Sequence, residues 1–108
     1  MARFLIQASY TQQGLAGLVQ SPEDRTAVIR TLIEGMGGRL DSIDYAFGEF
    51  EVVVMCDLPD NTSMAAFSMA VGASGAVSNI KTTVLIPTSE GFAAAQKAKE
   101  ITYRPPGS

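Results

Sequence analysis

Tyrosine and carboxylate side chains are the groups in this sequence that could carry out acid–base chemistry. Tyr10 and Tyr45 each offer a phenol, and five Asp and Glu residues lie between positions 41 and 57. A phenol beside a carboxylate can pass a proton to or from a substrate. Glu51 and Asp57 share one face of an expected strand, but these positions are six residues apart, which separates the side chains by roughly 20 Å. These two acids therefore cannot act as a catalytic pair within one chain.

Other catalytic and metal-binding patterns are missing from the sequence. The chain has no histidine, which excludes Ser-His and Cys-His nucleophile pairs and the commonest zinc and haem ligand sets. The acids lack the repeated spacing of a metal-binding loop. Cys56, the single cysteine, cannot form an internal disulfide and is expected to be a buried structural thiol. We predict no catalytic residue, no metal site and no cofactor.

Composition limits the class of protein and its partners. The 108 residues are 46% hydrophobic and 18% charged, which predicts one globular domain over residues 1–108. The net charge of −3 and the absence of a basic block argue against nucleic acid and anionic membrane surfaces as partners. No apolar run approaches the roughly 18 residues of a membrane span. No export signal is visible at the N-terminus, so a cytoplasmic location is expected.

The elements that must position these groups can be predicted from periodicity and capping signals. Residues 2–10 alternate between apolar and polar side chains, as a strand does. Residues 11–20 are expected to be a connector, and Ser21-Pro22 should begin a helix that Gly37-Gly38 ends. Further expected elements are strands over 39–47, 50–57 and 79–87, a two-residue hairpin loop at Gly48-Glu49, and helices over 62–77 and 90–100.

This order of elements predicts an α+β, ferredoxin-like fold. Its pattern is β-α-β-β-α-β with an extra C-terminal helix, which gives a four-stranded antiparallel sheet. Right-handed crossovers place two helices on one face and the first and third strands in the centre.

The face of the sheet turned away from the helices has an apolar centre. Pairing across the hairpin loop sets Tyr45 opposite Val52 and Phe47 opposite Phe50. The remaining face then carries Leu5, Val53, Met55 and Leu85, ringed by Arg3, Asp44, Glu51, Asp57 and Lys81. An apolar centre with a charged rim is typical of an interface, so we expect a homo-oligomer that forms through this open face.

A small-molecule pocket between sheet and helices is the second expectation. Tyr10 and Tyr45 fall on the helix side of the sheet, and the helix over 62–77 is rich in flexible Met. The expected lining is Tyr10 and Tyr45 with Phe47, Met64, Phe67 and Met69. A purely structural role, with each buried phenol bonded inside the core, explains the tyrosines equally well.

Several stretches resemble one known family. They are "SYT" near the N-terminus, "GGRLDSIDYAFGEFEVVVMCDLPDN", the Ala-rich helix after it, "KTTVLIP" and the closing "YRPPG". Together they resemble the GYD-domain family over nearly the whole chain. The Gly-Tyr-Asp motif of that family corresponds to Gly48, Phe50 and Glu51, so Phe replaces Tyr, Glu replaces Asp, and the phenol hydroxyl is absent.

The resemblance implies a shape and no particular activity. Its shape is similar to the dimeric α/β-barrel group, which includes monooxygenases, isomerases, dismutases and ligand-sensing regulators. Three hypotheses therefore stand. The first is a homo-oligomeric module that binds a small, partly apolar molecule without catalysis. The second is a cofactor-independent, monooxygenase-like or isomerase-like enzyme that uses Tyr10 or Tyr45 with a carboxylate, and the third is a structural oligomer with no ligand.

Overall fold

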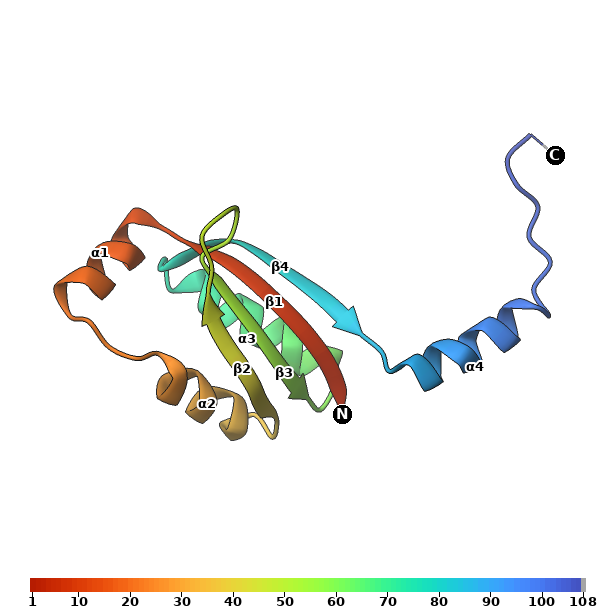
Figure 1. Cartoon of the computed structure of the whole chain (residues 1–108), viewed down its shortest axis with the longest axis horizontal. Helices are drawn as coiled ribbons and strands as arrows, with labels where there is room; N and C mark the ends of the chain where they lie inside the picture. Colours follow the sequence, from red (N-terminus) through yellow and green to blue (C-terminus); the bar gives the residue numbers. More distant parts are fainter. Residues whose placement is uncertain (108) are drawn as a thin grey trace.

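Four antiparallel strands form one sheet, in the order β2-β3-β1-β4, in the computed structural model, which describes residues 1–107 (Figure 1). In chain order the elements are β1 (Ala2–Tyr10), α1 (Gln12–Gln20), α2 (Thr26–Gly35), β2 (Arg39–Tyr45), β3 (Val52–Leu58), α3 (Asn61–Ala73), β4 (Val77–Leu85) and α4 (Thr88–Ala98). The first and third strands are central, as predicted, and the α+β, ferredoxin-like prediction is confirmed.

The hydrophobic core lies between the sheet and two helices, α2 and α3. Alternate residues of β1 and β3 point to this side and are buried: Phe4, Ile6 and Ala8 on β1, and Val52, Val54, Cys56 and Leu58 on β3. The helices contribute Ile33 from α2 and Met64 and Phe67 from α3. Period-two alternation in a strand directs one set of side chains to the core.

Two of the predicted helix ends are confirmed by their hydrogen bonds. Gly37 follows α2 with a φ of 83°, and the amide of Gly38 donates to the Ile33 carbonyl at 3.0 Å. Glycine adopts this left-handed conformation without a steric penalty, which ends the helix. At the start of α3 the Asp60 carboxylate accepts a hydrogen bond from the amide of Ser63 at 2.8 Å.

The segment over 11–20 is a complete helix, α1, and not the predicted connector. Its cap is Thr11, whose hydroxyl accepts a hydrogen bond from the Gly14 amide at 3.0 Å. Thr11 also donates its own amide to the Ala76 carbonyl, which fixes α1 beside the start of β4. The next helix, α2, begins at Thr26, so the predicted start at Ser21 was wrong: Ser21 caps the end of α1.

The hairpin between β2 and β3 is longer than predicted. Tyr45 pairs with Val52 as expected, but residues 46–51 form one loop in place of a two-residue turn at Gly48-Glu49. The loop is held against β1, because the Ser9 hydroxyl donates to the Glu49 carbonyl at 2.9 Å. Phe47 consequently does not face Phe50 and is fully exposed.

The helix α4 leaves the sheet and projects from the end of β4 (Figure 1). This gives the chain a long axis of 58 Å against 34 and 23 Å. Phe92 of α4 is exposed, as are Ile101 and Tyr103 beyond it. Strand alternation in the sequence places Val84 and Ile86 on the helix side, in the core, but both are exposed. Within residues 1–107, no helix has both the length and the apolar character that crossing a membrane requires.

Candidate functional site

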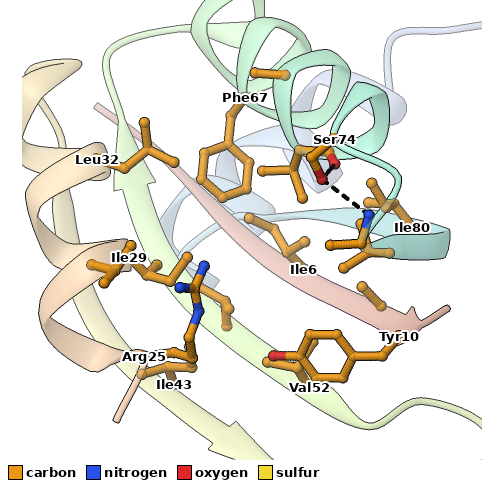
Figure 2. A pocket seen from close by; sticks show the side chains of 17 residues that line it. Ile6, Tyr10, Arg25, Ile29, Leu32, Ile43, Val52, Phe67, Ser74 and Ile80 are labelled. Atoms are coloured by element: carbon orange, nitrogen blue, oxygen red, sulfur yellow. Dashed lines mark hydrogen bonds between the residues drawn. The ribbon is translucent and has the colours of Figure 1, made fainter. Parts of the chain in front are cut away.

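An apolar cavity of about 270 Å³ lies between α2, α3 and the sheet (Figure 2). The sheet supplies its floor, α2 one wall and α3 the other. Its apolar lining comprises Ile6, Ala8, Ile43, Val52, Val54, Val77 and Ile80 from the strands, Val28, Ile29 and Leu32 from α2, Phe67, Ala70 and Val71 from α3, and Ala76 beyond α3.

The cavity exists because the two helices pack on different strands. α2 contacts β2, whereas α3 contacts β4 and β3, so the helices flank the space above β1. Small side chains at Ala8 and Ala70 leave this space unfilled. Val28 and Leu32 line the cavity and yet remain 43% and 38% exposed. A ligand in the cavity would remove this apolar surface from water, which favours binding.

Three polar residues, Arg25, Tyr10 and Ser74, also line the cavity. The Ser74 hydroxyl is already engaged: it donates to the Val71 carbonyl at 2.6 Å and accepts from the Ala76 amide at 3.2 Å. Arg25 stands at the start of α2 and forms an ion pair from Nη1 to Glu23 at 2.6 Å. Arg25 and Tyr10 therefore define the polar end of the cavity.

The phenol of Tyr10 keeps its proton at neutral pH. Burial, followed by a hydrogen bond with Tyr45, raises the pKa of Tyr10 to about 12, while the positive charge of Arg25 opposes this shift. The rings of Tyr10 and Tyr45 lie 6.4 Å apart at 53°. A protonated phenol can donate a hydrogen bond to a ligand.

The predicted pocket residues are only partly brought together. Tyr10 and Phe67 line the cavity, and Tyr45 lies beside Tyr10 outside its lining. Phe47 and Met69 do not line it: Phe47 projects from the 46–51 loop and, with Tyr10 and Tyr45, borders a second, more open hollow, whereas Met69 is 75% exposed on α3. Met64 is buried in the core. A ligand-binding role for any of these residues stays a prediction.

Arg25 and the α2 wall were missed by sequence reasoning. Helical spacing predicts an apolar stripe at Val28, Ile29, Leu32, Ile33 and Met36, but it does not show that this stripe borders a cavity, and it gives no role to Arg25. The available signal was an arginine directly before an apolar helical stripe that faces the same space as Tyr10.

No carboxylate lines the cavity among the described residues. The closest candidate by sequence was Glu51, whose carboxylate accepts a hydrogen bond from the backbone amide of Tyr10 at 3.0 Å. This contact holds the end of β1 and does not involve the phenol. The cavity can bind an apolar molecule with a polar end, and its own lining over the described residues holds no phenol–carboxylate pair for proton transfer. Glu23 and Glu51 lie with Tyr10 and Tyr45 around a neighbouring, more open hollow.

The predicted interface residues share the face opposite α2 and α3. Leu5 pairs with Met55, and Val53 and Leu85 lie on the same side, all four partly exposed. Ion pairs stand at one end of this face: Arg3–Asp41 at 2.6 Å and Arg39–Asp57 at 2.9 Å. The predicted charged rim is thus partly paired within one chain.

Cys56 is fully buried beneath the helices. Burial raises the pKa of its thiol to about 11, with the charge of Asp57 adding to the shift. Within residues 1–107 no group of three or more His, Cys, Asp or Glu side chains is arranged to hold a metal ion.

The fold and the cavity define a small α+β module of ferredoxin-like type with an apolar chamber between sheet and helices. Within that class, the family model described as GYD domain matches residues 4–95, and the chain belongs to this family. No curated protein and no solved structure matches the chain. Gly48, Phe50 and Glu51, which the resemblance assigns to the family motif, lie in the 46–51 loop, where the Glu51 carboxylate accepts a hydrogen bond from the Tyr10 amide.

Proposed function

We propose that this protein is a homo-oligomeric binding module that holds one small, partly apolar molecule in the cavity between α2 and α3. The observation that carries the proposal is the cavity itself, about 270 Å³ with a largely apolar lining. Ligand pockets are typically apolar chambers with a few polar groups that fix orientation. Arg25 and Tyr10 supply such groups here.

Partly exposed apolar side chains on the α2 wall of the cavity favour the binding of a ligand. Val28 and Leu32 keep roughly two fifths of their surface accessible (43% and 38%) although they line the cavity. Covering apolar surface contributes about 25 cal/mol per Å². A ligand that covers these residues would gain this contribution.

Binding is favoured over catalysis by the cavity lining. The enzyme hypothesis needs a carboxylate beside Tyr10 or Tyr45. The cavity lining over the described residues contains no Asp or Glu, and the carboxylates of Glu23 and Glu51 lie with both phenols around a separate, more open hollow. Glu51 is committed to the Tyr10 backbone amide.

Self-association is supported by two surfaces. The open sheet face carries partly exposed Leu5, Val53, Met55 and Leu85. The projecting α4 exposes Phe92 at 66% away from the sheet. Apolar groups gathered on a surface mark interaction sites, and a second copy would cover the open face.

Native mass spectrometry of protein purified from its own host tests the binding function. We expect a bound small molecule, and we expect Ala70→Leu to lose it, because the larger side chain fills the cavity. Ala65→Leu is the matched control: Ala65 is an exposed residue of α3 that does not line the cavity. Equal retention by both variants would contradict this location for the ligand.

A further inference from the structure

Arg25 is the charged residue that lines the cavity among residues 1–107. Its side chain is 33% exposed, so the guanidinium is partly withdrawn from water. Figure 2 shows it extending from the start of α2 alongside Ile29, over the same space as Ile6. A partly desolvated cation beside an apolar chamber favours an anionic group on any molecule that enters.

Tyr10 adds a hydrogen-bond donor at the same end of the cavity. Its hydroxyl points toward the side on which Arg25 lies (Figure 2). The phenol has a single proton, and a ligand carboxylate would accept it in place of the hydrogen bond with Tyr45. The polar end thus combines a positive charge with donors, and an acceptor with negative charge complements both.

The ion pair with Glu23 leaves room for such a group. Glu23 bonds to Nη1 at 2.6 Å, and its side chain is 50% exposed. Exposed pairs of this kind contribute little stability, so a ligand can compete with Glu23 for the guanidinium. Within residues 1–107 the other N–H donors of the Arg25 guanidinium have no hydrogen-bond partner and can make a bidentate contact.

Resting on the proposed binding function, we propose that the ligand is a small apolar carboxylate whose carboxylate group meets Arg25 and the Tyr10 hydroxyl while its hydrocarbon body fills the cavity. An apolar cavity of roughly 150 Å³ holds a benzene molecule. A cavity of about 270 Å³ therefore suits a ligand of roughly ten to twelve non-hydrogen atoms. Fatty acids of medium chain length and aromatic acids with one ring both meet this description.

Isothermal titration calorimetry of the full chain with two matched pairs of probes tests the charge. The pairs are octanoate with octanamide, and phenylacetate with phenylacetamide. Each pair keeps the apolar body and changes only the charge of the head group. We expect the carboxylate to bind at least about tenfold more tightly than its amide, as befits a hydrogen bond to a charged group.

Three substitutions identify the residue whose charge makes carboxylates bind more tightly than amides. Arg25→Gln should weaken carboxylate binding at least about tenfold and leave amide binding nearly unchanged. Arg30→Gln removes the same charge from an exposed position of α2 outside the cavity, and should leave both unchanged. Glu23→Gln removes the competing carboxylate and should tighten carboxylate binding.

The outcomes separate this proposal from the binding function on which it rests. Amides that bind as tightly as the carboxylates in both pairs would overturn the ligand class and leave the cavity's binding function standing. Equal effects of Arg25→Gln and Arg30→Gln would also overturn it. If none of the four probes binds and the protein from its host carries no small molecule, both proposals fall.

Discussion

At the scale of single residues, Cys56 is a packing group and not a reactive one. Its side chain is fully buried and does not line the cavity, and burial raises the pKa of its thiol to about 11. We expect iodoacetamide at pH near 8 to alkylate the folded protein far more slowly than the urea-unfolded chain, since the thiolate is the nucleophile. Cys56→Ala should cost about 1 kcal/mol of unfolding free energy, measured by urea denaturation. Rapid alkylation without unfolding would contradict this assignment.

The Tyr10 phenol should make the fold sensitive to alkali. Its pKa rises from an ordinary 10.0 to about 12 on folding, so between these values the folded chain holds the proton more tightly. Stability from this group is therefore complete below pH 10 and is lost as the pH rises toward 12. Cys56 acts in the same direction between 9.0 and about 11.

Tyr10→Phe separates these two contributions. In a Cys56→Ala background, unfolding free energies measured from pH 9 to 12 should fall less steeply once Tyr10 is replaced. The difference in tyrosinate absorbance between the chains with and without Tyr10 reports the pKa of this phenol, because the chain has two other tyrosines. An unchanged slope after Tyr10→Phe would contradict the raised pKa.

Part of the candidate site could be predicted from side-chain parity, the alternation by which every second residue of a strand points to the same face of the sheet, and part could not. Parity along β1 places Tyr10 on the helix side, beside the cavity. Phe47 follows the same parity along β2, but β2 ends at Tyr45, and the loop carries Phe47 into solvent. Parity holds only as long as the strand continues. Arg25 stands at the start of α2, before the apolar stripe, so the helical period of the stripe does not indicate its direction.

At the scale of elements, α1 is anchored by a close approach of its backbone to another segment. A Cβ added at Gly14 would collide with the Ala76 carbonyl oxygen, which accepts the Thr11 amide at 3.0 Å. Gly14→Ala should therefore displace α1 and cost about 1–3 kcal/mol of unfolding free energy. Gly17 is the matched control in the same helix, with nothing within 4 Å of an added Cβ. Gly17→Ala should stabilise by about 0.5–1 kcal/mol, because alanine loses less entropy in a helix.

Urea denaturation of both variants compares the two effects. Equal changes at Gly14 and Gly17 would show that packing against Ala76 does not hold α1. The same two glycines explain why α1 was not predicted, since they lower helix propensity in "QQGLAGLVQ". The Thr11 cap and the contact with Ala76 outweigh that propensity, and the second of these is a tertiary contact across 65 residues of sequence.

At the scale of the whole molecule, the order of the strands follows from local patterns. Alternation in β1 and a strand with apolar residues on both faces in β3 place these two strands in the centre, as observed. The direction of α4 has no such local cause. Its Ala-rich sequence predicts a helix, but a helix after Pro87 can fold back or project, and only contacts with other elements decide between these. Here it projects and leaves Phe92 exposed.

Association through the open sheet face should depend on the apolar side chain of Met55. Met55 lies near the centre of this face, opposite Leu5, and is partly exposed. A charge at the centre of a dry interface costs several kcal/mol, roughly 2–7 for a polar group without a partner. Met55→Glu should therefore shift the protein to monomers in analytical ultracentrifugation, at concentrations where the unmodified chain is an oligomer.

Ala27→Glu provides the control for added negative charge. Ala27 is an exposed residue in the first turn of α2, where an acid is tolerated at the positive end of the helix dipole. It should leave the oligomer unchanged, while circular dichroism verifies that both variants stay folded. An identical oligomer in Met55→Glu would remove the open face from the interface. Association would then have to use the other exposed apolar surface, which lies on α4. Phe92→Glu should abolish that association, because Phe92 is the largest apolar side chain that α4 exposes.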